Sequence, residues 1–303
     1  MPNVIPFLDN SRDVKPSAAI FLSGGGSNAE KILEACSTAG EKAPFKVVVL
    51  VTDRPGSSRA DEIGRSYGIP VVALDIRAFY RERGQSRVSI ATPEGRAVRE
   101  AWTDELRSAL REHAPDFGIL AGFVPLTNIT GDFPCLNVHP GDLTYEKDGR
   151  RYLIGLHTMP VERAILDHLP AMRSSVIIAV PYTGGGDDMD SGPILGVSGP
   201  VPIDLRGETV DSLRAIARER PAKRPVGGYK DRLEAVAEVN LERLKIGGDW
   251  EVFPKVVFDF ARGLFGHADG GDDLFFRMSG KWMPVETVVY SAAGREILFR
   301  DVS

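Results

Sequence analysis

One stretch decides the fold class of this chain: Ala18-Ala19-Ile20-Phe21-Leu22-Ser23-Gly24-Gly25-Gly26-Ser27-Asn28. A short apolar run ends at a glycine loop, and the residues from Ala29 to Ala39 have the composition of a helix. Strand, glycine loop and helix in this order aim backbone N–H groups and the positive end of a helix dipole at an anion. The alternative is a plain tight turn with Ser27 or Asn28 as the helix N-cap, and the loop alone leaves both open.

Strand-like and helix-like segments continue to alternate after this unit. Continuous apolar runs suit strands that are buried on both faces, and amphipathic segments between them suit helices. The spacing predicts an α/β fold, a mostly parallel sheet with helices on both faces. The segments are the expected strands 45–52, 70–74, 117–123 and 173–181 and the expected helices 60–67, 94–113, 205–218, 231–244 and 253–264.

Length and composition limit the class of protein. The 303 residues can bury a sizeable core, and 43% hydrophobic with 26% charged residues is ordinary for a globular protein. A net charge of −5 gives no general attraction to nucleic acid. The sequence shows no apolar run long enough for a membrane span and no secretory signal, so we expect no membrane partner and a cytoplasmic location. Cys36 and Cys135 provide neither a disulfide framework nor a metal set.

A second stretch carries the candidate chemistry, Asn137-Val138-His139-Pro140-Gly141. The period-two alternation of a strand places the Asn137 and His139 side chains on one face, and Pro140-Gly141 ends the strand. An amide donor beside an imidazole can hold a developing oxyanion and handle a proton, the two tasks of acyl transfer to an amine. Asp190, in a glycine-rich loop before another apolar run, could reach back to orient the imidazole.

These motifs, in this order, resemble the folate-dependent formyltransferases. Within that family the chain is most similar to the phosphoribosylglycinamide formyltransferases, whose phosphate loop Ser23 to Asn28 resembles. The resemblance runs from about Ala18 to Gly263. The motifs that carry it are Ser23 to Asn28, Leu120-Ala121-Gly122-Phe123, Asn137-x-His139, Gly155-Leu156-His157-Thr158, Asp190-Ser191-Gly192-Pro193-Ile194 and Phe253-Pro254 through Gly263.

The resemblance implies a Rossmann-like formyltransferase fold and a reaction. An amine, most simply that of glycinamide ribonucleotide, attacks the formyl carbon of 10-formyltetrahydrofolate, and no metal is required. Asn137 and His139 are implied to stabilise the oxyanion and Asp190 to orient His139. The implied phosphate-binding residues are Gly25, Gly26, Ser27 and Asn28, and the implied folate-binding residues are Phe123, Val124, Leu126, Asp187 and Asp188.

The chain departs from the family pattern at several places. Pro125 stands where a basic residue is common, and Ile177 stands where a second histidine is common, so imidazole chemistry should depend on His139 alone. We expect an N-terminal arm (1–17), a formyltransferase domain (18–264) with insertions near 81–92, 143–154 and 219–248, and a small C-terminal β meander (265–303). The charged start of the insertion at 219 indicates either a solvated face or, alternatively, a partner surface or a clamp on an acidic substrate.

The insertion at 143–154 is open to two interpretations. Lys147-Asp148-Gly149 is a strong hairpin turn signal, so the segment could be a solvent-facing hairpin. Alternatively, its cations and its two tyrosines, Tyr145 and Tyr152, could contact a base or sugar and select the amine substrate.

Other functions stay open on the sequence alone. The amine could belong to an amino sugar or a specialised metabolite, which the insertions favour. Water could replace the amine, giving a formyl-folate hydrolase, although such hydrolases usually carry an N-terminal regulatory domain. The chain could also be a catalytically silent binding protein, against which Asn137, His139 and Asp190 together argue. A homodimer is compatible with the sequence, and the other expected partners are small molecules.

Overall fold

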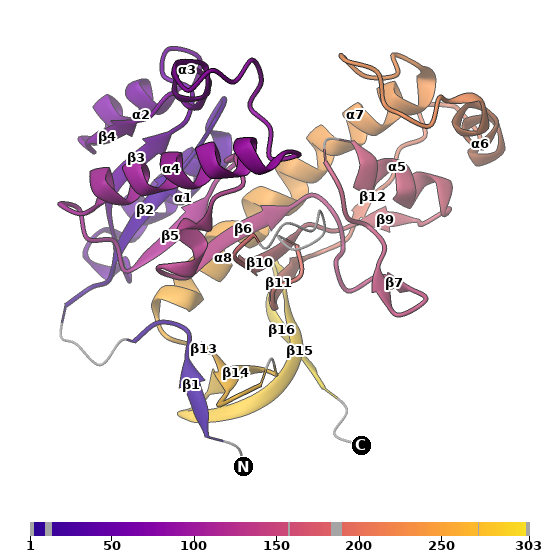
Figure 1. Ribbon diagram of the computed structural model, residues 1–303. Coiled ribbons are helices and arrows are strands. Elements are labelled where there is room, and N and C mark those ends of the chain that lie inside the picture. Colours follow the sequence, from indigo (N-terminus) through magenta and orange to yellow (C-terminus); the bar gives the residue numbers. More distant parts are fainter. Residues whose placement is uncertain (1–2, 10–13, 157, 183–189, 272, 301–303) are drawn as a thin grey trace.

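The computed structural model describes residues 3–9, 14–156, 158–182, 190–271 and 273–300 (Figure 1). Its N-terminal half is a parallel sheet in the strand order β4-β3-β2-β5-β6, with helices between the strands. The elements are β2 (Ser17–Phe21), α1 (Ser27–Ala39), the short 3₁₀ turn η1 (Gly40–Lys42), β3 (Lys46–Thr52), α2 (Ala60–Tyr67), β4 (Val71–Ala73), α3 (Ile76–Glu82), α4 (Pro93–Leu110), β5 (Phe117–Leu120), η2 (Asn128–Gly131) and β6 (Cys135–His139). The expected α/β fold is confirmed.

The strand order reverses between β2 and β5. From β2 the chain moves to β3 and β4 on one side and then to β5 and β6 on the other. In open α/β sheets the loops diverge at such a switch point and leave a crevice at the carboxyl ends of the strands, where ligands bind. The glycine loop lies after β2 and His139 ends β6, so both lie at this edge.

Both faces of the sheet are buried, as the continuous apolar runs predict. In β2, Ala18 and Ile20 belong to the core under α1 and α8 (Trp250–Ala261), whereas Ala19 and Phe21 belong to the core under α3 and α4. Period-two alternation therefore sends neighbouring side chains of one strand into two different cores. Figure 1 shows the helices on either face of the sheet.

The sheet continues through antiparallel strands into the C-terminal segment. β10 (Ser175–Ala179) pairs with β6, and β11 (Ile194–Ser198) pairs with β10. β15 (Lys281–Ser291) then pairs in parallel with β11, and β14 (Leu274–Met278) and β16 (Gly294–Phe299) pair with β15. The expected C-terminal antiparallel strands are present. They extend the main sheet, and β1 (Val4–Pro6) of the N-terminal arm joins them by pairing with β13 (Phe265–Ala268).

A helical lobe lies beside the sheet (Figure 1). Its core is formed by apolar residues such as Leu153, Ile165, Leu213 and Leu233. Its elements are β7 (Glu146–Lys147), β8 (Arg150–Arg151), α5 (Met159–Leu166), β9 (Ala171–Met172), β12 (Val201–Pro202), α6 (Val210–Glu219), α7 (Arg232–Leu244) and the π-helical segment η3 (Lys245–Asp249), which runs into α8. Within the described residues, no helix is both long and apolar enough to cross a bilayer.

Two arginines in the charged start of the insertion at 219, Arg220 and Arg224, are not solvated, whereas Arg218, Glu219 and Lys223 are exposed. Arg220 donates to Glu162 of α5 at 2.5 Å and, through a bidentate pair of bonds at 2.7 Å, to Asp231 at the start of α7. Only 11% of its side chain is exposed. Arg224 pairs with Glu234, and both arginines lie over the ring of Tyr229. The positive charges therefore hold the insertion onto the lobe.

Candidate active site

Ser23 joins three strand ends at the switch point. Its hydroxyl donates to Asp53, which follows β3, at 2.5 Å, and accepts from the backbone N–H of Val124, which follows β5, at 2.9 Å. Ser23 and Asp53 are both buried. Burial raises the pKa of the Asp53 carboxyl, and the hydrogen bond from Ser23 offsets part of that increase. Ser23 is therefore a structural tie between the loops, which leaves the residues after it to face a ligand.

The glycine loop has an open part and a packed part. A Cβ atom added at Gly24 or Gly25 would meet nothing within 4 Å, and both residues are exposed. Gly26 has φ +68°, and a Cβ there would approach the Ile63 side chain to 2.5 Å. Gly26 is also the N-cap of α1, where no side chain accepts a capping hydrogen bond. The first N–H groups of α1 are thus free of a side-chain cap, which suits an anion.

Arg59 fixes the outer side of this loop. Its guanidinium donates to the carbonyl of Gly25 at 3.1 Å, and its backbone N–H donates to that of Gly24 at 3.1 Å. The same side chain forms ion pairs with Glu30 and Glu62. Because these carboxylates neutralise Arg59, an anion in the loop depends mainly on backbone N–H groups.

His139 is buried at the end of β6 and is held from two sides. Its Nε2 lies 2.7 Å from the carbonyl oxygen of Leu153, and its Nδ1 lies 3.4 Å from Oδ2 of Asp190. A carbonyl oxygen only accepts, so Nε2 carries the hydrogen. Asp190 then lies where a carboxylate can orient the ring and accept from a protonated Nδ1. The structure brings together the imidazole and the carboxylate that the sequence pairs.

Gly141 makes the contact with Leu153 possible. A Cβ at this position would lie 2.4 Å from the carbonyl oxygen of Leu153 and 3.0 Å from Nε2 of His139. Only glycine leaves room for the backbone of the insertion to approach the ring. The Pro140-Gly141 step therefore both ends the strand and shapes the site.

Asn137 lies on the same face of β6 as His139, as the alternation predicts. It is half-buried, opposite Leu120 of β5 and Ile177 of β10. Among the described residues its side-chain amide has no hydrogen-bond partner, so it can donate to a ligand. Ile177 is fully buried in the core of the sheet and brings no polar group to the site.

The segment from Asp190 to Gly192 is fixed against β10. A Cβ at Gly192 would lie 1.9 Å from the carbonyl oxygen of Ile178, so this position needs glycine for close backbone approach. From the other side, Arg151 donates to the carbonyl oxygens of Asp190 and, at 2.8 Å, of Gly192. Two other residues expected in this loop, Asp187 and Asp188, lie outside the described residues, as does His157.

The sequence analysis missed a buried carboxylate next to the glycine loop. Asp249, which precedes α8, accepts from the hydroxyl of Ser174 at 2.6 Å and from the amide of Asn28 at 3.2 Å. Burial raises the pKa of its carboxyl. An aspartate before an apolar helix is usually an N-cap, but the Asp249 side chain makes no capping bond. Asn28 also has a buried Oδ1 without a described partner. Asn28 is thus turned toward Asp249 and is partly engaged.

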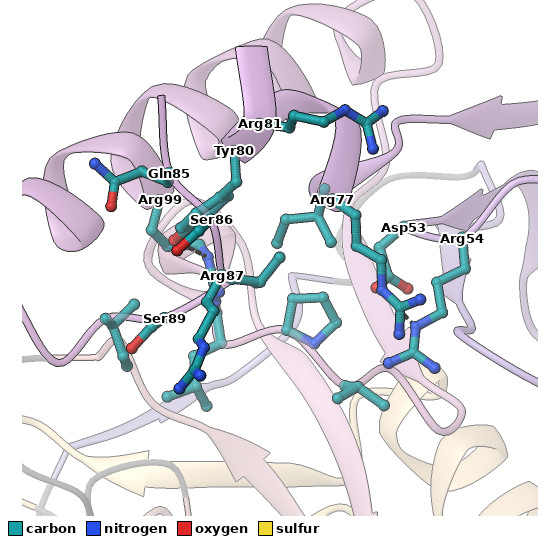
Figure 2. Close-up of a pocket in the computed structure, with 16 residues that line it drawn as sticks. Asp53, Arg54, Arg77, Tyr80, Arg81, Gln85, Ser86, Arg87, Ser89 and Arg99 are labelled. Atoms are coloured by element: carbon teal, nitrogen blue, oxygen red, sulfur yellow. Dashed lines mark hydrogen bonds and ion pairs between the residues drawn. The ribbon is translucent and has the colours of Figure 1, made fainter. Parts of the chain in front are cut away.

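A basic pocket of 780 Å³ opens beside Val124, Pro125 and Leu126 (Figure 2). In Figure 2, Arg54 and Arg77 lie together beside Asp53, and Arg87 lies across from them. The described residues form no ion pair with Arg77 or Arg87, and both are exposed. The charged residues that line this pocket are Asp53, Arg54, Arg77, Arg81, Arg87 and Arg99. An excess of unpaired arginines over one buried aspartate favours a ligand with carboxylate or phosphate groups.

The loop that borders this pocket is supported from below. Arg99 donates to the carbonyl oxygen of Leu126 at 2.6 Å, so this buried arginine holds the loop. Phe123 does not line the pocket. Its ring is buried against Trp102 and Phe21, with centroid distances of 6.3 and 5.4 Å. Val124 and Leu126 line this pocket and Phe123 does not, so a direct contact of Phe123 with folate stays a prediction.

Comparisons with known proteins identify the relatives of this chain. No model of a known protein family matches it. The chloroplastic phosphoribosylglycinamide formyltransferase of Arabidopsis thaliana is 29% identical over 254 residues, which cover 80% of this chain and 73% of the relative. The phosphoribosylglycinamide formyltransferase of Escherichia coli (strain K12) is 27% identical over 206 residues, which cover 65% of this chain and 77% of the relative.

Solved structures of the same kind share the fold. The phosphoribosylglycinamide formyltransferase of Coxiella burnetii, in complex with CHES, has a TM-score of 0.54 at 17% identity over 89% of this chain and 96% of its own. The phosphoribosylglycinamide formyltransferase of Anaplasma phagocytophilum has a TM-score of 0.54 at 20% identity, over 92% of this chain and 99% of its own. The sequence matches show that this chain is similar to phosphoribosylglycinamide formyltransferases, as its motifs predict. The structure matches show that it shares their fold.

Proposed function

We propose that this protein transfers the formyl group of 10-formyltetrahydrofolate to a primary amine, and that the amine is that of glycinamide ribonucleotide. The observation that carries the proposal is the group formed by Asn137, His139 and Asp190 at the carboxyl edge of the sheet. It lies at the same edge as the open glycine loop. A formyl donor and a phosphorylated amine can thus meet at one edge of the sheet.

The chemistry follows from the geometry of these three residues. The amine attacks the formyl carbon, the carbonyl oxygen becomes an oxyanion, and N10 of the folate leaves with a proton that the amine has released. The side-chain amide of Asn137 donates to the oxyanion. The Leu153 carbonyl and Asp190 hold the His139 ring in place, so its imidazole helps to stabilise the oxyanion and to move the proton from the amine toward N10. Asp190 keeps the ring oriented.

The two ligands have separate places to bind. The backbone N–H groups of Gly25, Gly26, Ser27 and Asn28 suit the phosphate of the amine substrate. The donor lies along Val124 and Leu126, and its acidic glutamate end enters the basic pocket, where the exposed Arg77 and Arg87 complement carboxylates.

A formylation assay tests the proposal. The protein is mixed with 10-formyltetrahydrofolate and a panel of amines, including glycinamide ribonucleotide and amino sugars, and the products are followed by mass spectrometry. We expect formylated glycinamide ribonucleotide, and we expect His139→Ala to lower kcat by about 10²–10⁴-fold. Formate release without any formylated amine would identify a hydrolase. If no product forms above the His139→Ala background, the chain is catalytically silent.

A further inference from the structure

The hairpin inserted after His139 is attached to the helical lobe. The Tyr145 hydroxyl and the Lys147 ammonium both donate to Asp167, at the end of α5. Tyr145 and Tyr152 pack edge to face with ring centroids 6.2 Å apart, and Lys147 lies over the Tyr152 ring at 4.2 Å. The turn is the predicted hairpin, with Asp148 and Gly149 both at positive φ. Both tyrosines therefore have protein partners in the hairpin and the helical lobe.

Arg151 points from the second strand of the hairpin toward the site. It donates to the carbonyl oxygens of Asp190 and Gly192, which belong to the segment on the far side of His139. No carboxylate of the described residues lies within ion-pair distance of Arg151. Burial lowers the pKa of Arg151, and the carboxylates of Asp190 and Glu146 offset part of that decrease. Among the described residues, its hydrogen bonds go to the Asp190 and Gly192 carbonyl oxygens, so the guanidinium is committed to that segment.

We propose that Arg151 is a positioning residue that holds Asp190 against His139. The proposal rests on the proposed function, because it takes His139 and Asp190 as the residues that act on the formyl group. The Asp190 to Gly192 segment is held between two supports, the backbone of β10 at Gly192 and the guanidinium of Arg151. With its carbonyl fixed, the carboxylate of Asp190 stays 3.4 Å from Nδ1 of His139.

The shape of the guanidinium explains why arginine is needed. Its planar fork donates to two acceptors at once, here carbonyls two positions apart in the chain. The compact ammonium of lysine can reach one of them. The insertion thus acts on the chemical step through Asp190, which differs from the expected role of the hairpin in selecting the amine.

Steady-state kinetics of Arg151→Met, Arg151→Lys and the control Arg150→Met test this role. Arg150 is its exposed neighbour on the same strand. We expect Arg151→Met to lower kcat by up to about 10²-fold, because small misplacements at a reacting centre have effects of this size. The Michaelis constants for both substrates should stay within about twofold of the wild-type values. The kcat of Arg151→Lys should lie between those of the wild type and Arg151→Met, and the kcat of Arg150→Met should match the wild type.

A double-mutant cycle with Asp190→Asn shows whether Arg151 acts through Asp190. In the Asp190→Asn background, Arg151→Met should lower kcat by less than about twofold, since the group that it positions is already lost. An equal loss of kcat in both backgrounds would overturn the proposal. So would a rise in the Michaelis constant for the amine with kcat unchanged, which would restore substrate selection by the hairpin.

Amide hydrogen exchange separates a failure of this proposal from a failure of the proposed function. A peptide that contains residues 190–198 should exchange faster in Arg151→Met than in Arg150→Met, whether or not any amine is formylated. If the wild type is inactive on every amine, the proposed function fails, and the exchange result still decides the role of Arg151. Equal exchange in the two variants would overturn it.

Discussion

At the residue scale, glycines decide which backbone segments come close to the reacting groups. Gly141 admits the Leu153 carbonyl to His139, and Gly192 admits the Asp190 segment to β10. In the glycine loop the roles differ from one residue to the next. Gly26 is packed against the core, whereas Gly25 faces open space. Substitutions in this loop can therefore separate folding from binding.

We expect valine to affect substrate binding at Gly25 and stability at Gly26. Gly25→Val adds a side chain in the open space where a phosphate would lie, so it should raise the Michaelis constant of the amine substrate and leave that of the folate nearly unchanged. Gly26→Val forces a β-branched side chain into positive φ and against Ile63, so it should lower the melting temperature. Kinetics and thermal melts of both variants check this. Unchanged amine binding in Gly25→Val would show that the loop is only a turn.

The buried carboxyl of Asp249 predicts a pH-dependent stability. Its pKa is raised above the unfolded value of 3.8, so over the window above 3.8 the native state keeps a proton that the unfolded state releases. The stability that Asp249 contributes is therefore present below pH 3.8 and is lost as pH rises through the raised pKa.

Asp249→Asn does not titrate, so its free energy of unfolding relative to the wild type should increase from pH 4 toward neutrality. Urea melts at several pH values measure this difference, with Asp61→Asn, at an exposed aspartate of α2, as the control. A difference that does not change with pH would contradict the prediction.

At the element scale, charged residues hold the helical lobe together. Arg220 connects α5, the start of α7 and the chain after α6 through Glu162 and Asp231. The lobe in turn carries the hairpin and Leu153, which contacts His139. The insertion at 219–248 therefore influences the site through the packing of α5 and α7.

Removal of Arg220 should loosen the lobe. Arg220→Met leaves Glu162, only 8% exposed, without its cation, and loss of one partner of a buried ion pair typically destabilises by about 3–5 kcal/mol. Denaturant melts should show this loss, whereas Arg218→Met, at an exposed position two residues earlier, should be close to neutral. Equal stability of the two variants would mean that the buried pairs contribute little.

At the scale of the whole molecule, the C-terminal strands belong to the main core. Phe265, Phe276, Val288 and Tyr290 are buried in the same cluster as β2 and α8. Tyr290 also donates to the buried carboxyl of Asp259 on α8 at 2.9 Å. The C-terminal strands are thus attached to the sheet through β11 and to α8 through their side chains.

A chain truncated after Gly263 should fail to fold stably. Truncation exposes the edge of β11 and the apolar face of α8, and unpaired strand edges promote aggregation. Soluble yield and circular dichroism of the truncated chain, beside the full chain, measure the effect. A truncated protein that melts like the full chain would show that the extension is an independent appendage.

The sequence by itself determined the alternation of strands and helices, the position of the glycine loop and the shared face of Asn137 and His139. These features follow from local periodicity and from glycine chemistry, which neighbouring residues are enough to specify. The hairpin at Lys147-Asp148-Gly149 was predictable for the same reason.

The sequence also paired Asp190 with His139, but only the tertiary structure decided the other contacts between distant side chains. Arg151 holds Asp190, Asp249 reaches Asn28 and Arg220 is buried. Each contact joins residues that are far apart in sequence, and it depends on strand order and on the path of loops that periodicity does not describe. The sequence suggested solvent or a partner for the charge run around Arg220, and either solvent or substrate for the hairpin. In the structure, Arg220 pairs with the buried Glu162, and Arg151 of the hairpin donates to the carbonyl of Gly192.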